Sequence, residues 1–380
     1  MSQGLVRHVL AVFGIALLLG LPIGAPSAPG VEAAEEIKIG VIAPLTGKSS
    51  AMGRQYKVGL ELAVKEINGT GGINGRPVVL LVEDDQGSPK EAASVAQKFA
   101  ADPGIVAVIG TNSTTGNLAT LPILSKAKIP TITPVSSSTQ LAPKSPFMFQ
   151  AFSTVDQYTA KIAEFSVKEL KGKRIALHYV NDDWGREGRE FFAARLKELG
   201  AELVAETTFK WGDQDFKAQM TQVKAANPDV LHIFGLYSEG ALSTQQARNL
   251  GIKAHIIGNV GILFPQYVEI AGKAAEGTIA SAEFFSGDPR PEVQAFVKKF
   301  KAATGEDPGV FSATAYDAIQ LVFEAIKKVG TDREKAAAAL AAIRDFKGTT
   351  GVISFNDQRQ IIRQTSWVIV RDGRWVNYEK

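Results

Sequence analysis

Residues 174–209 read RIALHYVNDDWGREGREFFAARLKELGAELVAETTF, and this stretch decides the fold. It opens with one short apolar run, Arg174–Tyr179, and closes with another, Leu203–Phe209. Between the two runs, Phe192 and Leu196 are spaced as on one face of a helix. A helix between two short apolar strands predicts a βαβ unit, in which the strands run parallel.

The same alternation continues on both sides of this stretch. Further strands are expected at residues 37–43, 78–82, 105–109, 129–133, 230–234 and 255–257. Helices are expected at residues 53–68, 89–101, 163–170, 216–226 and 240–250. One sheet would not hold all of these strands comfortably, and the pattern starts again near Ser153. The sequence therefore predicts an α/β fold with two doubly wound, Rossmann-like lobes.

The pattern changes after residue 285. Two amphipathic helices are expected around residues 293–300 and 319–326, followed by an alanine-rich helix at 333–342. Residues 351–376 have the pattern of antiparallel strands, with turns at Asn356-Asp357 and Asp372-Gly373.

Composition excludes several classes of protein. The 380-residue chain has no cysteine, and 42 Lys and Arg against 39 Asp and Glu give a formal charge of +3. Without cysteine there can be no disulfide scaffold, thiolate zinc site, iron–sulfur cluster or cysteine nucleophile. The small net charge gives no basis for nucleic-acid binding.

Residues 1–33 have the pattern of a cleavable signal peptide. Arg7 and His8 precede the apolar run Val9–Leu21, which is shorter than the roughly 20 residues that span a bilayer. Small residues follow, and cleavage is expected after Ala33. Because there is no cysteine to carry a lipid anchor, we expect a free protein in a Gram-negative periplasm.

Signals of an enzyme are weak. His178 and His232 lie in apolar strand runs, where structural roles are expected, and there is no HExxH, GxSxG or P-loop motif. The glycine-rich run Gly69–Gly75 follows a helix and precedes a strand, the reverse of a dinucleotide loop, and so favours a helix C-cap with a turn. Asp84 and Asp85 are expected to form a solvated strand end. We therefore expect no catalytic site, metal or cofactor.

Two hydroxyl-rich loops follow strands of the first lobe. Strand 105–109 leads into Gly110–Gly116, which reads GTNSTTG, and strand 129–133 leads into Pro134–Thr139, which reads PVSSST. Ligands of doubly wound sheets bind at the carboxyl ends of strands, where helix N-termini and hydroxyls can hold an anion. One hydroxyl per loop would suffice for helix capping, so the pattern favours a carboxylate site.

Motifs of one known family follow one another along residues 35–370. They are IKIGVIAPLTG at 37–47, GGING at 71–75, DD at 84–85 with Pro89, ITP at 132–134, QAR at 246–248 and YDA at 316–318. The chain resembles the leucine/isoleucine/valine-binding protein family, the periplasmic receptors of branched-chain amino-acid ABC transporters.

The resemblance implies a type I periplasmic binding protein whose two lobes are joined by three hinge crossovers. These are expected near Ser153, Glu283 and Gln360. One lobe would comprise residues 35–152 with 284–360, and the other 153–283 with 361–380. The resemblance also implies that the ligand lies between the lobes, which close over it.

The family's ligand residues can be transferred position by position. The resemblance implies a carboxylate clamp made by Thr114, or Ser113 in the alternative register, and by Val135, Ser136 and Ser137. It places the walls of the site at Met52, at Trp184, and at Leu236 or Tyr237. No catalytic or metal-binding role is implied for any of these residues.

One position departs from the family pattern. The family's acidic partner of the ligand ammonium falls on Val260, which cannot accept a hydrogen bond. Either Glu239 or Asp183 restores amino-acid binding, or the ligand is an aromatic or aliphatic acid, or an amide, without an ammonium. A buried unpaired ammonium would cost several kcal/mol.

The sequence thus favours a monomeric, non-enzymatic transport receptor. It would capture a small carboxylated solute and deliver it to permease subunits with their ATPases. A ligand-sensing module of a signalling system, which uses the same two-lobe fold, is the alternative.

Overall fold

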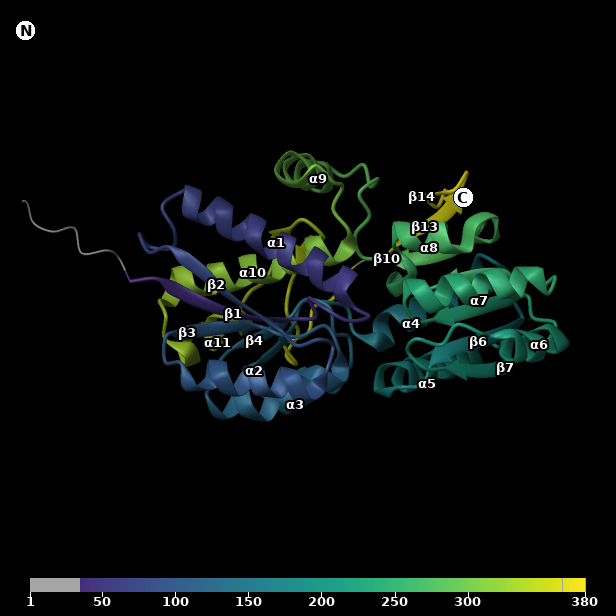
Figure 1. The fold of residues 1–380 in the computed structure, drawn as a ribbon, viewed down its shortest axis with the longest axis horizontal. Coiled ribbons are helices and arrows are strands. Elements are labelled where there is room, and N and C mark those ends of the chain that lie inside the picture. Colours follow the sequence, from purple (N-terminus) through teal and green to yellow (C-terminus); the bar gives the residue numbers. More distant parts are fainter. Residues whose placement is uncertain (1–34, 364, 380) are drawn as a thin grey trace, which may run out of the picture. The chain divides into compact units, whose positions relative to one another are not determined.

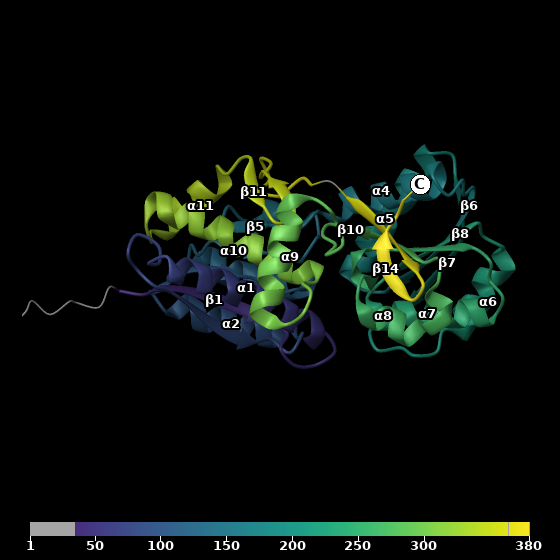
Figure 2. The ribbon, with the colours of Figure 1, turned by 90° about the horizontal axis from the view of Figure 1, so that it is seen from above.

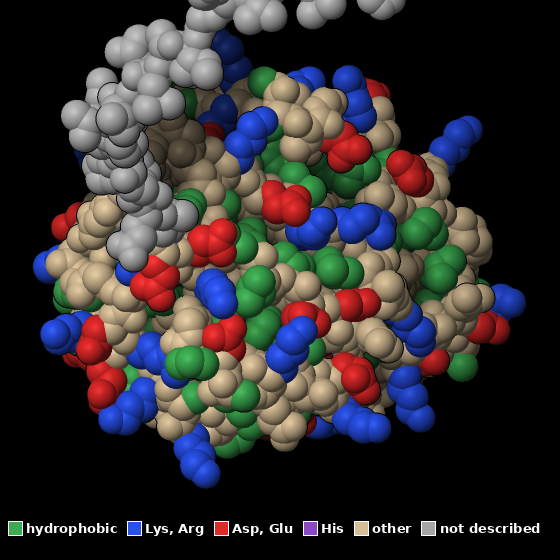
Figure 3. Space-filling view, turned by 60° about the vertical axis from the view of Figure 1, so that its left-hand side comes forward, with side chains coloured by type: hydrophobic (Ala, Val, Ile, Leu, Met, Phe, Trp, Pro, Cys, Tyr) green, Lys and Arg blue, Asp and Glu red, His purple; other side chains and the backbone are tan. Residues whose placement is uncertain are grey.

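The structure, a computed structural model, describes residues 35–363 and 365–379. The predicted signal peptide, residues 1–33, lies outside the described residues. Among the described helices, none is long and apolar enough to cross a membrane. On the face drawn in Figure 3, basic and acidic side chains are interspersed, without a large area of one sign.

The first lobe is built on a parallel five-stranded sheet with the order β2-β1-β3-β4-β5. Its strands are β1 (Ile37–Ala43), β2 (Val78–Asp84), β3 (Ile105–Ile109), β4 (Thr131–Thr133) and β5 (Met148–Gln150). One face is covered by α1 (Ser50–Gly69) and α10 (Val310–Val329), the other by α2 (Pro89–Ala101) and α3 (Thr114–Lys126), as Figure 1 shows. Apolar side chains on both faces bury the sheet.

The second lobe is built on a seven-stranded sheet with the order β14-β13-β10-β9-β8-β6-β7. Its strands are β6 (Arg174–Val180), β7 (Glu202–Phe209), β8 (Val230–Phe234), β9 (His255–Gly258), β10 (Ile279–Ala282), β13 (Ser366–Arg371) and β14 (Arg374–Asn377). One face carries α4 (Val155–Lys168) and α5 (Asp183–Glu198). The other carries α6 (Lys217–Ala226), α7 (Tyr237–Asn249) and α8 (Pro265–Ala271).

The chain returns to the first lobe after β10 and to the second after β12. The elements between are α9 (Pro291–Thr304), α10, α11 (Arg333–Ala341), β11 (Phe346–Gly348) and β12 (Gly351–Ile353). Figure 2 shows α9, α10 and α11 beside the first sheet, and β14 within the second lobe. This return accounts for the change of sequence pattern after residue 285.

The predicted α/β class and the two parallel-sheet lobes are confirmed. The turn at Asp372-Gly373 is also confirmed, since both residues have positive φ and join β13 to β14. The predicted strand at 129–133 was too long at its start. Ile129 donates its backbone N–H to Leu124 at the end of α3, and β4 begins at Thr131.

Candidate ligand-binding site

A cavity of about 580 Å³ lies between the lobes, and we name it the interlobe cavity. Loops after β1, β2, β3 and β4 line it from the first lobe, and loops after β6, β7, β8 and β9 line it from the second. It therefore stands at the carboxyl ends of the strands in both sheets, where doubly wound folds bind ligands, and its size suits a small molecule.

All of the site residues expected from the sequence lie on the wall of this cavity. They are Met52, Ser113, Thr114, Val135, Ser136, Ser137, Trp184, Leu236, Tyr237 and Val260. Both members of the two undecided pairs, Ser113 with Thr114 and Leu236 with Tyr237, contribute. Two other hollows, of about 700 and 960 Å³, are lined by none of these residues.

The two neighbouring hydroxyls of the first loop have different partners. Ser113 caps α3, because its Oγ accepts a hydrogen bond from the backbone N–H of Gly116 at 3.0 Å. Thr114 is the first residue of the helix, and its buried Oγ1 lies 3.4 Å from Oγ of Ser136 on the second loop. Capping thus accounts for Ser113 but not for Thr114.

Hydrogen bonds hold the second loop, Pro134–Thr139, in place at the cavity wall. Thr133 accepts a hydrogen bond from the backbone N–H of Ser136 at 3.0 Å, and Gln150 donates to the carbonyls of Ser136 and Ser138. No hydrogen bond within the described residues engages the backbone N–H of Ser137. That donor is buried at the cavity wall and is therefore available to a ligand.

The wall of the second lobe is aromatic. Trp184 lies in the first turn of α5, where Asp182 caps the helix by accepting from the N–H of Gly185 at 2.8 Å. A Cβ at Gly185 would lie 1.7 Å from the carbonyl oxygen of Val180, so only glycine lets α5 start so close to β6. The Trp184 ring stacks 6.3 Å from that of Trp211, and the two planes differ by 9°.

The indole N–H of Trp184 also links the two lobes. It donates to Oγ of Ser137 in the first lobe at 3.1 Å and to the hydroxyl of Tyr158 at 2.7 Å. Tyr158 lies in the first turn of α4, and its hydroxyl is 3.1 Å from Oγ of Ser137. Tyr158 was not expected from the sequence, because it fits the buried stripe of an amphipathic helix.

Three charged side chains line one corner of the cavity, around the loop at Trp211 and Gly212. Lys48 donates to the carbonyl of Trp211 at 3.1 Å, and Asp182 accepts from its indole N–H at 2.9 Å. Burial raises the pKa of Asp182 above its ordinary value. Glu239 accepts from the backbone N–H of Gly212 at 2.7 Å and from the Ser238 hydroxyl.

The two acids suggested as ammonium partners are placed differently. Glu239 reaches the cavity wall, whereas Asp183 does not line it and pairs with Arg186 at 2.5 Å instead. The suggestion of Asp183 is therefore wrong. The Asp183 side chain points outward from α5, and the neighbouring Asp182 lines the cavity instead. Val260 begins a 3₁₀ turn (Val260–Ile262) and is buried at the wall.

The other polar residues considered in the sequence have structural roles. Asp84 accepts from the backbone N–H groups of Leu45 and Gln86, each at 2.8 Å. Asp85 is not a solvated strand end, since it is buried and bonded to Thr111 and Gly87. The expectation for Asp85 was wrong because the loop after β3 covers it.

His178 and His232 are buried within the second sheet. Burial lowers the pKa of each to about 3, so both are neutral. His178 bonds to Thr207 through Nδ1 at 2.8 Å. Across residues 35–363 and 365–379, no group of acidic and histidine side chains is arranged to hold a metal ion.

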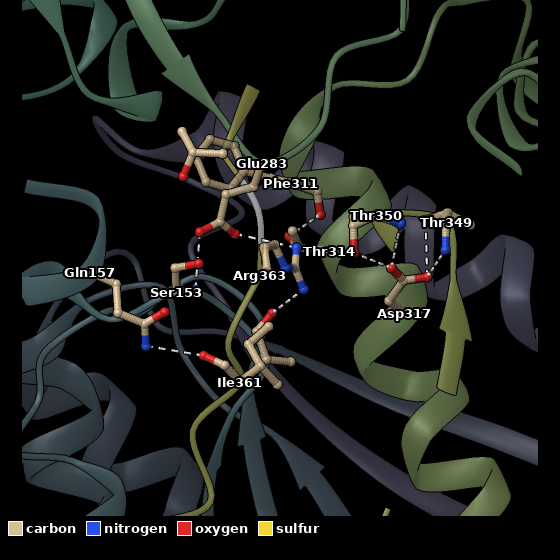
Figure 4. A network of polar contacts seen from close by, with 12 residues as sticks. Ser153, Gln157, Glu283, Phe311, Thr314, Asp317, Thr349, Thr350, Ile361 and Arg363 are labelled. Carbon is tan, nitrogen blue, oxygen red and sulfur yellow. Dashed lines mark hydrogen bonds and ion pairs between the residues drawn. The ribbon is translucent and has the colours of Figure 1, made fainter. Parts of the chain in front are cut away.

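Three connecting segments of the lobes meet at one buried cluster, shown in Figure 4. The backbone N–H of Ser153 donates to Oε1 of Glu283 at 3.1 Å, and Arg363 pairs with Oε2 at 3.3 Å. The two charged side chains are 4% and 2% exposed. Nearby, Asp317 of α10 accepts four hydrogen bonds from Thr349 and Thr350, which anchors the β11–β12 hairpin.

A family model described as "Periplasmic binding protein" matches residues 36–373. The chain belongs to this family. Among curated relatives, Leu/Ile/Val-binding protein homolog 1 of Brucella suis is 30% identical over 348 residues, covering 90% of this chain and 92% of that protein.

Solved structures of the family are similar over 90% of this chain. The leucine-binding protein LivK of Thermotoga maritima has a TM-score of 0.85 at 31% identity, and 98% of it is covered. LivJ of Streptococcus pneumoniae, in complex with isoleucine, has a TM-score of 0.85 at 28% identity and 98% coverage. A solute-binding protein of Rhodopseudomonas palustris, in complex with 3,4-dihydroxybenzoic acid, has a TM-score of 0.83 at 25% identity and 95% coverage.

These comparisons confirm the family and the type I fold expected from the sequence. The relatives and the fold are those of solute-binding proteins of the branched-chain amino-acid transporter type, and not of enzymes.

Proposed function

We propose that this protein is the periplasmic solute receptor of an ABC transporter, and that it captures a small carboxylate between its lobes. The observation that carries the proposal is the composition of the interlobe cavity. Hydroxyl and N–H donors of Thr114 and Ser137 stand on one wall, and the rings of Trp184 and Tyr237 stand on the other. Such a cavity fits an acid with an apolar body.

The proposed division of the lobes follows the sequence expectation. Residues 35–152 with 284–360 would move against residues 153–283 with 361–380, about crossovers near Ser153, Glu283 and Gln360. A ligand that contacts both lobes favours the closed form through its differential affinity for that form. The closed, loaded monomer would then be the form that the permease and its ATPases recognise.

The position of Val260 supports a ligand that lacks an ammonium group. Its apolar side chain is buried at the cavity wall and cannot itself accept a hydrogen bond from an ammonium. Both carboxylate oxygens of Glu239 already accept hydrogen bonds from its own lobe. An aromatic or aliphatic acid therefore fits the cavity better than an amino acid does.

One observation favours a branched-chain amino acid as the second candidate. Glu239 lies at the cavity wall and is only 5% exposed, and each carboxylate oxygen retains a free lone pair. Relatives support both chemistries, since one is in complex with isoleucine and another with 3,4-dihydroxybenzoic acid.

A thermal-shift screen tests the proposal. It would compare leucine, isoleucine and valine with benzoate, 3,4-dihydroxybenzoate and 4-methylpentanoate, because a ligand that binds the folded state alone raises the melting temperature. We expect the ammonium-free acids to stabilise the protein and the Ser137→Ala variant to lose the response.

Stabilisation by the three amino acids alone, at micromolar concentration, would refute the ammonium-free ligand. In that case Glu239→Gln should abolish the response if Glu239 is the ammonium partner. A protein that responds to none of the six acids, while a neutral solute stabilises it, would contradict the carboxylate receptor itself.

A further inference from the structure

Three polar groups from three separate elements meet at one point of the interlobe cavity. Oγ of Ser137 comes from the loop after β4, the hydroxyl of Tyr158 from α4, and the indole N–H of Trp184 from α5. Their three separations are 3.1, 2.7 and 3.1 Å. Ser137 belongs to the first lobe, whereas Tyr158 and Trp184 belong to the second.

The hydrogens of this cluster outnumber its acceptors. Trp184 can only donate, and it points at both Ser137 and Tyr158. Each hydroxyl carries one hydrogen, and only one of the two can lie between Ser137 and Tyr158. The other hydroxyl hydrogen has no further acceptor among the residues that the structure describes.

The unpaired hydroxyl hydrogen indicates a ligand contact, because the cluster is buried and also lines the cavity. Ser137 is 4% exposed and Tyr158 is 3% exposed. A buried donor without an acceptor costs free energy, and an oxygen of a bound ligand would remove that cost. The backbone N–H of Ser137, which is also unengaged, adds a second donor at the same place.

We propose that the ligand carboxylate is held from both lobes, with the Tyr158 hydroxyl and the Trp184 indole N–H donating to it together with Ser137. This inference rests on the proposed function and adds Tyr158 as a specificity-determining residue. An ammonium fits this point poorly, because it offers only donors and both hydroxyl oxygens of the cluster already accept from Trp184.

The protonation of Tyr158 agrees with a donor role. Burial raises the pKa of its phenol far above the ordinary value, and the nearby charges of Glu283 and Glu187 raise it further. Those two acids are already engaged, Glu283 with Arg363 and Glu187 with Thr139. The phenol is therefore neutral and keeps its hydrogen at neutral pH.

The arrangement also couples the carboxylate to closure. Donors of the second lobe reach the anion only when the two lobes stand together, so the carboxylate itself contributes differential affinity for the closed form. A neutral amide of the same shape accepts fewer and weaker hydrogen bonds and should close the protein less well.

The test uses calorimetry with two matched probe pairs, benzoate with benzamide and leucine with leucinamide. Tyr158→Phe removes only the hydroxyl and should weaken binding of the carboxylate probe roughly tenfold or more, with little change for the amide. Tyr179→Phe, on β6 outside the cavity, is the matched control and should leave both affinities unchanged. Trp184→Phe, a second variant, removes the N–H and should act in the same direction.

The outcomes separate this inference from the proposed function. If Ser137→Ala weakens the carboxylate probe while Tyr158→Phe and Trp184→Phe do not, the receptor stands and the two-lobe clamp is overturned. An equal loss for carboxylate and amide in Tyr158→Phe would also overturn it, since only packing would then have changed. If the unmodified protein binds none of the six acids of the screen, while a neutral solute stabilises it, the proposed function fails first, and the clamp with it.

Discussion

The adjacent hydroxyls of Ser113 and Thr114 have different roles. Ser113 Oγ accepts a hydrogen bond from a backbone N–H of α3, so helix capping already accounts for this hydroxyl. The hydroxyl of Thr114 lies beside that of Ser136 at the cavity wall and does not cap the helix. The family resemblance implied Thr114 as the ligand contact, with Ser113 as the alternative register, and their positions at the start of the helix distinguish them.

This difference leads to a prediction at three positions. Ser137→Ala and Thr114→Ala should each weaken binding of the carboxylate identified in the screen by about 1–3 kcal/mol, as for a lost hydrogen bond to a charged group. Ser113→Ala should instead cost about 1 kcal/mol of unfolding free energy, through loss of the cap, and spare the affinity. Calorimetry and urea unfolding would measure the two effects. Equal losses of affinity at Ser113 and Thr114 would contradict this assignment.

A buried charge pair gives a second prediction. Glu283→Gln leaves Arg363 charged and 2% exposed, without its partner, and should lower the unfolding free energy by about 3–5 kcal/mol. The double variant Glu283→Gln/Arg363→Met should recover part of this loss, because it removes the stranded charge. Urea denaturation of both variants measures the difference. A double variant no more stable than the single one would show that the charge is not the cause.

At the level of elements, sequence patterns served best where a segment is long or strongly apolar. The expected bounds of α2 (Pro89–Ala101) and β3 (Ile105–Ile109) are those of the structure. The strands β5 and β10 were missed, because three or four residues cannot show a period. The two hydroxyl-rich loops of the first lobe were predicted from the rule that ligands bind at strand ends, whereas the positions in the second lobe came from the family resemblance.

Tyr158 escaped prediction for a different physical reason. It has the spacing of the buried stripe of α4, and its ring does stack on Phe234, 6.1 Å away. Its hydroxyl meets Ser137 and Trp184 at the cavity wall. Spacing along a chain reports which face of a helix is buried, but not where the end of a long side chain stops.

The interior strand β8 contains His232, which leads to a prediction of pH dependence. Burial lowers its pKa to about 3, against an ordinary value of 6.5, and neither ring nitrogen has a hydrogen-bond partner in the described structure. Below pH 6.5 His232 therefore binds a proton in the unfolded chain but not in the folded protein. The free energy of unfolding falls as the pH drops from 6.5 toward 3. Between pH 7 and 5 this histidine should account for a loss of about 2 kcal/mol.

His232→Phe should make that pH dependence shallower, because the new ring packs between Phe192 and Phe234 without titrating, while His178 still contributes. Urea unfolding at pH 7 and pH 5 would show it. Parallel slopes for the variant and the unmodified protein would mean that His232 contributes nothing.

On the scale of the whole molecule, the predicted signal peptide leads to a prediction about export. The sequence predicts that residues 1–33 are removed, so mass spectrometry of the protein from the periplasm should give an N-terminus at Ala34, within a few residues. The same preparation should contain no lipid-modified form. Protein that retains Met1 in the periplasmic fraction would contradict the signal-peptide prediction.

The pairing of β13 with β10 constrains the order in which the molecule can be completed. β10 ends at Ala282, its antiparallel neighbour begins at Ser366, and the described elements between them pack with the first lobe. While the ribosome is still translating that intervening segment, the second sheet lacks an edge, and the first lobe lacks α10. Neither lobe can therefore complete its fold early during synthesis. If the predicted signal peptide directs the unfolded chain across a membrane, this delay would keep the chain competent for translocation.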